Sequence, residues 1–425
     1  MSRQNKQNKQ IRNNRQYTYF VKSKYFPESF IDEQFKSRGN WIKYDIPLHR
    51  KKKAIDFVYL DELFYTNPRY YSLPAKLKNT VNDDKRQISF KHNLVRNLLG
   101  DANGSKYVMP QYEIDLYTMK TDIITTLHNN YKKLFTGNAV YIFKPVTGMG
   151  GSDIGIFDTF AAFKRYIDNV ISRNGKLWGK GNPDKEPLRV WVLQEYITNP
   201  LLIEKKEATI GSHNYKFHIR QAYLYQPAPK QSYYRPLNIC PIAIAEKPYI
   251  HGDWSNKDIH DTHFHGKIDY DWQTLIQLIP TLKNNPKAIR RIDNQLTELY
   301  SIIDKNYIKA QCYPETKNCF ELFGCDIMIT DTFDVKVIEI NAGLGISGDI
   351  NIKRDIFDTV MVNIVDMYYP PKNKVTLPNK LFTPVMKQLR KSAISKRVLG
   401  KQLNKRINGL QTKKVIKHAT ISLKS

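Results

Sequence analysis

The chain has 425 residues, of which 41% are hydrophobic and 25% are charged, and its formal net charge is +27. This composition is typical of a soluble globular protein with enough material for two or three packed units. No apolar run approaches ~20 residues, which excludes a membrane-spanning helix, and the first residues lack the apolar core of a secretory signal.

The positive charge is concentrated at the two ends of the chain. Residues 371–425 contain fifteen Lys or Arg and no Asp or Glu, so this stretch supplies +15 of the +27. Residues 1–24 are also basic and are rich in Asn and Gln. Basic ends attract polyanions such as nucleic acid, an anionic membrane or an acidic protein tail. We predict a flexible basic N-terminus over 1–24 and a basic tail over 371–425; the alternative is that both ends are simply solvated.

The four cysteines, Cys240, Cys312, Cys319 and Cys325, include no Cys-x-x-Cys pair. This pattern favours reduced thiols in an intracellular protein over a disulfide framework. We therefore expect an intracellular, cytoplasmic protein.

Residues 25–88 are rich in Tyr, Phe, Lys and Pro, with strand-like segments at Trp41–Ile46 and Ala54–Tyr59. We predict a small α/β domain here, and its residues do not indicate a role. A helix is predicted over Ser89–Leu99, because apolar residues recur at four-residue steps along it. This helix carries Lys91, which on its own is typical of any solvated helix face.

The segment Ala139–Val146 has a strong strand pattern with Lys144 near its end, and the glycine-rich stretch Thr147–Gly155 follows directly. Glycines let a backbone approach phosphate oxygens closely and present N–H groups to them. The lysine precedes the glycines, so this is not a Walker loop. A phosphate-binding loop and a glycine-rich hairpin without a ligand both fit this pattern. A helix is predicted next, over Asp158–Arg173, followed by a Gly/Pro/Lys-rich loop at Asn174–Pro187.

Two further buried strands are predicted at Leu188–Ile197 and Tyr215–Tyr225. Along the second strand, Lys216, His218 and Arg220 occupy alternate positions, so three basic groups share one face. Cations in such a row repel one another unless anions lie opposite them. The row therefore favours a phosphate or carboxylate partner over a solvent-exposed face.

The residues His260, His263 and His265 form a His-x-x-His-x-His run. The run is compatible with zinc, but no Cys or carboxylate set completes a tetrahedral site. A long helix is predicted over Asn285–Asn306, with Asn285 as its N-cap. Ile356–Tyr369 is predicted as the last apolar helix.

The most informative stretch is Phe320–Asn341, where two apolar strands flank a polar turn at Thr330–Asp334. Glu339 and Asn341 are two residues apart, so both project from the same side of the second strand. A hairpin brings Asp326 beside them. Two carboxylates and one amide form an all-oxygen site for a hard divalent cation, and Mg²⁺ held in this way usually carries substrate phosphates. The alternative is an ordinary hairpin with one wet face.

Taken in order, these segments resemble the ATP-grasp superfamily and, within it, the tubulin–tyrosine ligase-like family, from about Ser89 to Asn351. The resemblance rests on Lys144-Pro145 before a glycine loop, LQEYITNPLLI from Leu193, KFHIR from Lys216, KPY from Lys247, and FELFGCDIMI followed by VIEINA. It implies an ATP-grasp fold of the α/β (α+β) class. In that fold a small N-terminal domain (25–88) precedes a central domain (89–206) and a C-terminal domain (207–370), which hold the nucleotide between antiparallel sheets.

The resemblance also implies a role for each matching residue. Lys91 and Lys144 are implied to hold the nucleotide phosphates. Lys216 and Arg220, the catalytic candidates, are implied to lie near the γ-phosphate and the acceptor carboxylate. The three oxygen-bearing residues of the hairpin, Asp326, Glu339 and Asn341, are the implied Mg²⁺ ligands. The implied ATP-binding set is Lys91, Lys144, Gly148, Gly150, Gly151, Gln194, Glu195, Tyr196, Ile197, Lys216 and Thr262.

Four positions depart from the family pattern. His218 stands where the family has an Asp, Met149 where it usually has a basic residue in the glycine loop, and His263 where it has an Asn. The family's Arg corresponds to Ala243 or a neighbouring residue, with Arg235 as a candidate substitute. All four belong to the acceptor and amino-acid side of the site, whereas the residues implied to bind ATP and Mg²⁺ are kept.

The activity implied is that of an ATP-dependent carboxylate–amine ligase that works through an acyl phosphate. ATP and Mg²⁺ are the implied cofactors, a free amino acid (Glu, Gly or Tyr) is the group added, and the acceptor is an acidic protein such as a tubulin tail. No membrane partner is expected. Two alternatives stay open. One is an ATP-grasp ligase with a non-tubulin substrate. The other is a non-catalytic ATP- or polyanion-binding module whose basic ends contact nucleic acid.

Overall fold

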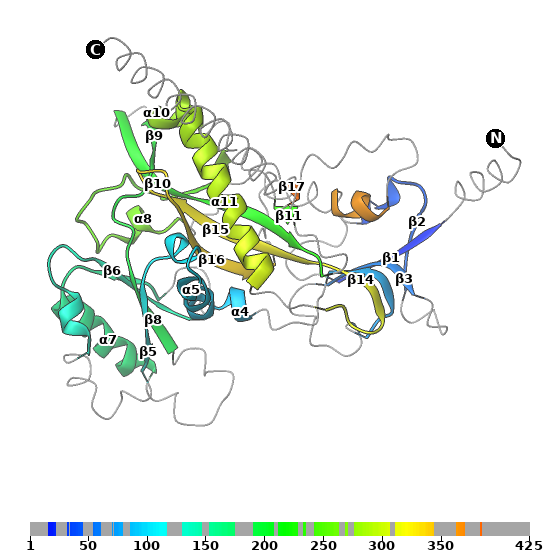
Figure 1. The fold of residues 1–425 in the computed structure, drawn as a ribbon, viewed down its shortest axis with the longest axis horizontal. Helices are drawn as coiled ribbons and strands as arrows, with labels where there is room; N and C mark the ends of the chain where they lie inside the picture. Colours follow the sequence, from blue (N-terminus) through cyan, green and yellow to red (C-terminus); the bar gives the residue numbers. More distant parts are fainter. Residues whose placement is uncertain are drawn as a thin grey trace, which may run out of the picture.

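The computed structural model of the protein describes residues 16–22, 32–33, 35–45, 54–60, 70, 72–79, 86–116, 130–146, 153–174, 190–207, 211–227, 233–234, 242–262, 268–270, 276–306, 311–343, 363–369 and 383–384. Within these ranges, no helix has both the length and the apolar character that a membrane crossing requires. The described strands form three sheets (Figure 1).

The first sheet is parallel, lies at one end of the molecule (Figure 1), and has the strand order β14-β4-β3-β1-β2. Its strands are β1 (Tyr17–Lys22), β2 (Trp41–Lys43), β3 (Ile55–Leu60), β4 (Ala75–Lys78) and β14 (Thr316–Cys319). The prediction of a flexible terminus over 1–24 is therefore wrong for Tyr17–Lys22. The alternating residues Tyr19 and Val21 are 1% exposed and bury this strand inside the sheet.

The C-terminal part of the chain also packs on this first sheet. Of the predicted helix Ile356–Tyr369, residues 363–369 lie in the described range, and 363–368 are helical. Ile364 and Val365 join the apolar core under the sheet, and Arg38 pairs with Asp366 at 2.6 Å. Strand β14 and this short helix therefore belong to the first sheet and its core, although the sequence analysis assigns both to the C-terminal domain (207–370).

The second sheet is antiparallel, with the order β5-β8-β6-β7. Its strands are β5 (Gln111–Asp115), β6 (Tyr141–Pro145), β7 (Gly155–Phe157) and β8 (Val190–Glu195). Helix α7 (Phe160–Asn174) covers one face of it. This helix buries Phe163, Ile167 and Val170 against Phe143 and Trp191, as its apolar stripe predicts.

The third sheet is built around β10, the longest strand, which pairs with β9, β11, β12 and β15, all antiparallel. Its strands are β9 (Leu202–Glu207), β10 (Gly211–Tyr225), β11 (Tyr233–Tyr234), β12 (Ile242–Ile244), β13 (Ile268–Tyr270), β15 (Glu321–Ile329), β16 (Val335–Ala342) and β17 (Thr383–Pro384). β17 is the described part of the predicted basic tail.

The remaining helices lie around the second and third sheets, and the 3₁₀ turn Lys132–Leu134 lies beside the core of the second sheet. They are α4 (Arg86–Ser89), α5 (Lys91–Gly100), α8 (Lys257–His260), α10 (Pro280–Lys283), α11 (Pro286–Asn306) and the 3₁₀ turns Ser105–Tyr107 and Lys132–Leu134. The predicted cap is confirmed, because Asn285 Oδ1 accepts from the Ala288 backbone N–H at 3.0 Å. Helix α11 packs on the face of β10 that carries Gln221, whose Oε1 accepts from Tyr300 at 2.6 Å.

The cysteine prediction needs one correction. Cys312 and Cys319 are joined by a disulfide, although the sequence pattern favours reduced thiols. A turn closed by the bond from the Thr316 backbone N–H to the Tyr313 carbonyl brings the two residues together. Cys325 is a free, buried thiol, and Cys240 lies outside the described residues.

Candidate active site

The predicted hairpin forms, and it brings the three oxygen-bearing residues to one place. In the antiparallel pair β15–β16, Asp326 lies directly opposite Glu339, and Gly324 lies opposite Asn341. Residues opposite each other across such a pair share a face of the sheet. The polar turn is closed by the bond from the Thr330 N–H to the Asp334 carbonyl at 3.0 Å.

The two carboxylates lie in different electrostatic surroundings. Asp326 is fully buried and binds Arg220 through both oxygens, with Nε–Oδ1 at 2.5 Å and Nη2–Oδ2 at 3.0 Å. Glu339 is more accessible: its Oε2 lies 3.0 Å from Lys91 Nζ, and its Oε1 accepts from Asn341 Nδ2 at 3.0 Å. Arg220 therefore neutralises Asp326 in this structure, while Glu339 and Asn341 present their oxygens at the more open end of the site.

The lysine on β6 adds a buried cation to this site. Lys144 is 4% exposed. Burial, together with the nearby charge of Lys91, lowers its pKa to about 8, and Glu339 partly opposes this lowering. These neighbours show that strand β6 of the second sheet and helix α5 lie beside the β15–β16 hairpin of the third sheet. Within the described residues, Lys144 forms no ion pair.

A second buried cation comes from strand β10. Lys216 is 4% exposed, and burial lowers its pKa to about 7; Asp261 opposes this effect, and Lys144 adds to it. Its Nζ donates to the Tyr196 hydroxyl. Burying an ammonium group is costly unless an anion compensates it. Lys144 and Lys216 thus form a desolvated positive pair, and a polyanion is the ligand that would relieve their repulsion.

Of the three basic residues that share one face of β10, Lys216 and His218 are buried and Arg220 is partly buried. His218 is 1% exposed, its Nδ1 lies 2.5 Å from Thr262 Oγ1, and its Nε2 lies 3.5 Å from Asp326 Oδ1. Thr262 therefore contacts β10 through His218, and it lies on the same segment as His260.

Three of the residues predicted to receive adenine, Gln194 and Glu195 at the end of β8 and Tyr196 just after it, donate hydrogen bonds within the protein. Gln194 Nε2 donates to the Met109 carbonyl at 3.3 Å. The backbone N–H groups of Glu195 and Tyr196 donate to the carbonyls of Pro110 and Val140. Ile197, the last residue of this predicted set, is half-buried. Gly148, Gly150 and Gly151 lie outside the described residues, as do His263 and His265.

The hairpin suits a hard divalent cation by the chemistry of its donors. Carboxylate and amide oxygens are the ligands that Mg²⁺ prefers, and Asp326, Glu339 and Asn341 supply them from adjacent strands. Among the described residues, no group of three His, Cys, Asp or Glu side chains is arranged to hold a metal. A cation at this hairpin therefore depends on the amide of Asn341 as a donor beside the two carboxylates.

The sequence interpretation misses one part of the site, the contact between His260 and Tyr196. His260 Nδ1 lies 2.9 Å from the Tyr196 hydroxyl, so His260 joins the lysine network and is not an isolated zinc ligand. The signal available in the sequence is its place two residues before Thr262, in the segment that the family resemblance identifies.

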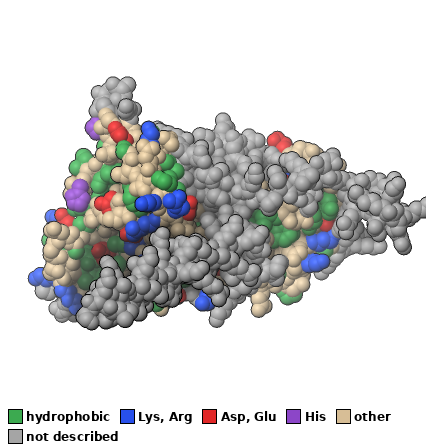
Figure 2. Space-filling model, turned by 45° about the horizontal axis from the view of Figure 1, so that its top comes forward, with side chains coloured by type: hydrophobic (Ala, Val, Ile, Leu, Met, Phe, Trp, Pro, Cys, Tyr) green, Lys and Arg blue, Asp and Glu red, His purple; other side chains and the backbone are tan. Residues whose placement is uncertain are grey.

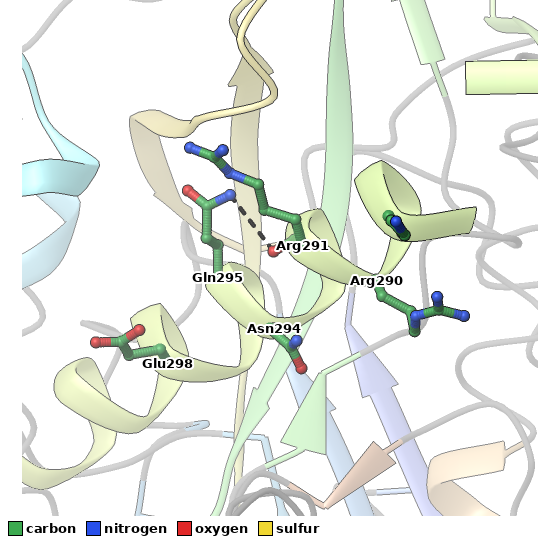
Figure 3. A pocket seen from close by; sticks show the side chains of 6 residues that line it. Arg290, Arg291, Asn294, Gln295 and Glu298 are labelled. Atoms are coloured by element: carbon green, nitrogen blue, oxygen red, sulfur yellow. Dashed lines mark hydrogen bonds between the residues drawn. The ribbon is translucent and has the colours of Figure 1, made fainter. Parts of the chain in front are cut away.

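A hollow of about 440 Å³ lies away from these residues, on the outer face of α11 (Figure 3). It is lined by Lys287, Arg290, Arg291, Asn294, Gln295 and Glu298. Helix α11 packs on the face of the third sheet opposite to Arg220 and Asp326. The hollow is therefore separate from the candidate active site.

Two antiparallel sheets that hold lysines and oxygen ligands between them define an ATP-grasp fold, and comparison with solved structures confirms it. The chain is similar to the crystal structure of the C-terminal domain of K. lactis Pby1, described as an ATP-grasp enzyme interacting with the mRNA decapping enzyme Dcp2. The TM-score is 0.55 at 18% sequence identity, over 87% of this chain and 98% of that one.

The particular family follows from the sequence match. A model of the tubulin-tyrosine ligase family matches residues 70–234 and 250–377, so the chain belongs to this family. It is 28% identical over 237 residues to "Probable tubulin--tyrosine ligase PBY1" of Saccharomyces cerevisiae. The match covers 48% of this chain and 29% of that protein, so the chain spans less than a third of this relative.

Proposed function

We propose that the chain is an ATP-dependent carboxylate–amine ligase that adds Glu, Gly or Tyr to an acidic protein acceptor. An acceptor carboxylate attacks the γ-phosphorus of ATP, which gives an acyl phosphate and ADP. The amine of the incoming amino acid then attacks the acyl carbon, and inorganic phosphate leaves as the amide bond forms. The protein positions the reactants and offsets the charge that develops as the phosphoryl group moves.

Each residue of the site has a distinct part in this proposal. Lys144 and Lys216 neutralise the phosphates as buried point charges. Lys91 bridges the phosphates to Glu339, its 3.0 Å partner. Asp326, Glu339 and Asn341 would hold Mg²⁺, which when bound supplies a Lewis-acid charge beside the transferring group. Arg220 holds Asp326 in place and borders the acceptor side.

One observation carries the proposal: two desolvated lysines from two different sheets, Lys144 and Lys216, lie near each other, and their pKa values are lowered to about 8 and about 7, mainly by burial. A fold does not gain stability from such an arrangement, because each buried ammonium is disfavoured without an anion. A nucleotide triphosphate with its metal supplies the missing negative charge.

The experiment that tests this function offers the protein labelled Glu, Gly and Tyr in turn, with Mg·ATP and purified tubulin or a cell extract. Incorporation of one label into protein, dependent on ATP, supports the ligase and identifies the amino acid. Nucleotide binding without incorporation from any of the three would favour the non-catalytic module.

The acidic acceptor is supported by charge. The chain carries +27 overall, and on the face shown in Figure 2 several Lys and Arg side chains lie close together, with others spread over the same face. Opposite fields speed the encounter of two proteins and help to choose partners. The described ATP-grasp neighbour interacts with a decapping enzyme, which favours including non-tubulin acceptors in the same assay.

We expect ATP binding to take up protons at pH 8. Lys144 and Lys216, with pKa values of about 8 and about 7, are partly neutral there, and a bound triphosphate favours their charged forms. Calorimetry in two buffers with different ionisation enthalpies measures the uptake, which shrinks towards pH 6, where Lys216 is already charged. Identical heats in both buffers at pH 8 would contradict the assignment.

Deletion of residues 372–425 should weaken capture of an acidic acceptor about tenfold or more at low salt, because the deleted stretch carries fifteen of the basic residues and no acidic one. ATP affinity should not change. Acceptor binding is measured at two salt concentrations for the full and shortened chains. If the affinity of the full-length protein for the acceptor does not depend on salt, residues 372–425 do not contribute to acceptor binding.

A further inference from the structure

The residues behind Lys216 form a hydrogen-bond chain that the proposed reaction does not explain. Lys216 Nζ donates to the Tyr196 hydroxyl, and that hydroxyl lies 2.9 Å from His260 Nδ1. His260 Nε2 lies 2.7 Å from the Asp253 carbonyl. Tyr196 and His260 are 6% and 8% exposed, so solvent does not replace these contacts.

The groups at the two ends of this hydrogen-bond chain fix which atom donates and which accepts in every bond. A carbonyl only accepts, so His260 Nε2 carries the proton and donates to Asp253. The other ring nitrogen, Nδ1, is then an acceptor in the neutral ring, and the Tyr196 hydroxyl donates to it. The lone pairs of that hydroxyl are left to accept from Lys216, which is a donor at every proton of its ammonium group.

The surroundings of His260 keep the ring neutral and fixed. Burial lowers its pKa to about 4, with an opposing effect from the Asp253 carbonyl and a further lowering from Lys216. Trp254 stacks on the imidazole, with ring centroids 5.6 Å apart and planes inclined by 25°. Tyr249 meets the ring edge-on at 5.9 Å. The ring therefore has one tautomer and little freedom to rotate.

The segment that carries His260 contacts β10 at a second point. Thr262, two residues further on, holds His218 through the 2.5 Å contact to Nδ1. Lys216 and His218 are successive residues on the same face of β10. One short segment thus holds two neighbouring site residues, the first through Tyr196 and the second directly.

We propose that Tyr196 and His260 are positioning residues for Lys216, and that they aim its ammonium group at the phosphates through a hydrogen-bond chain anchored on the Asp253 carbonyl. The inference rests on the proposed function, because the phosphates are those of ATP. The charged and titratable groups that face Lys216 are Lys144 on β6 and Asp261 after α8, in addition to Tyr196 and, behind it, His260.

The expected kinetic result is a loss in kcat with little change in nucleotide affinity. Tyr196→Phe removes one hydrogen bond to a charged group, so kcat for ligation should fall about 10- to 100-fold. The apparent ATP affinity should stay within about threefold, because the ammonium charge is still present. Tyr249→Phe is the matched control: it removes the same atom from a ring beside His260, but this hydroxyl donates to the Thr198 carbonyl at 2.9 Å.

The histidine offers a rescue series that separates positioning from packing. His260→Asn places an acceptor oxygen near the position of Nδ1, whereas His260→Leu fills the space without one. The Asn variant should retain more kcat than the Leu variant, while the two have similar thermal midpoints. Equal kcat in the two variants would mean that the ring contributes only packing.

NMR spectroscopy tests the hydrogen-bond chain without requiring catalytic activity. In protein labelled with ¹⁵N-histidine, His260 (assigned by its loss in His260→Asn) should show a protonated Nε2 and an unprotonated Nδ1 at neutral pH. Adding Mg²⁺ with a non-hydrolysable ATP analogue should shift the Nδ1 signal in the wild type and in Tyr249→Phe, but not in Tyr196→Phe.

The outcomes distinguish this inference from the proposed function. If the wild type ligates but Tyr196→Phe matches Tyr249→Phe in kcat, or if the proton lies on Nδ1, the positioning role is wrong and the ligase stands. If the wild type binds no nucleotide at all, the ligase proposal fails, and the inference fails with it.

Discussion

Replacing Glu339 by Gln should abolish Mg²⁺-dependent ligation, with a loss in kcat/KM of about 1,000-fold or more. Glu339 is the more accessible of the two hairpin carboxylates, and Lys91 and Asn341 both bind it. The amide keeps the size of the side chain but removes the charge that a hard cation and Lys91 require. ATP-dependent incorporation of labelled amino acid, measured over a range of Mg²⁺ concentrations, gives the result.

The matched control is Glu298→Gln, the same change on α11, where the carboxylate pairs with Lys106 on the surface at 2.8 Å. Glu298 lies outside the candidate site, so this variant should ligate like the wild type. Circular dichroism should show both variants folded, because Glu339 is on a hairpin whose core is apolar. Normal turnover by Glu339→Gln at every Mg²⁺ concentration would remove the metal assignment.

The hairpin at the centre of this prediction could be found from sequence because its contacts are local. Asp326 and Glu339 face each other across a turn of a few residues, so period-two alternation and one polar turn are enough to place them together. The row of basic residues on β10 correctly predicted a negatively charged partner, because cations on one face of a strand require anions opposite them. For Arg220 that anion is Asp326, a residue of the chain itself.

The contacts that escaped prediction are those between residues far apart in the sequence. Strand β14 pairs in parallel with β4, with Thr316 opposite Ala75, and no local pattern encodes such a distant pairing. Tyr17–Lys22 lies within a basic, Asn/Gln-rich terminus whose composition hides the strand. The His260–Tyr196 contact joins residues 64 positions apart, and a histidine run reads more readily as a metal site than as a hydrogen-bond link.

The disulfide shows the limit of compositional reasoning. Cysteine spacing favours reduced thiols for the whole chain, but the turn before β14 brings Cys312 and Cys319 together. The pairing depends on how this turn meets the parallel sheet, which only the three-dimensional arrangement of the chain reveals.

Replacing Lys216 by Met should stabilise the ligand-free protein and at the same time remove nucleotide-dependent activity. Lys216 is 4% exposed, and a fall in its pKa from 10.5 to about 7 corresponds to a folding cost on the order of 5 kcal/mol at pH 6. Met fills a similar volume without a charge, and the Tyr196 hydroxyl keeps His260 as its partner. Ligation should fall about 100-fold or more, because a phosphate-binding cation is lost.

The sign of the pH dependence follows from the lowered pKa. Between about pH 7 and 10.5 the unfolded chain binds more protons at this lysine than the folded one, so wild-type stability rises with pH through this window. The advantage of the Met variant should therefore be largest at pH 7 and below, and should shrink as the pH rises towards 10. Denaturation midpoints at pH 6 and pH 9.5 measure it, with Lys164→Met as control, because Lys164 is a partly exposed lysine paired with Asp168 on α7.

A variant that is less stable than the wild type at pH 6 would mean that Lys216 is compensated within the fold. Burial of Lys216 would then no longer indicate a missing polyanion. The inference depends on a cost in stability, because a residue that destabilises the ligand-free protein is expected to be retained for its function in binding.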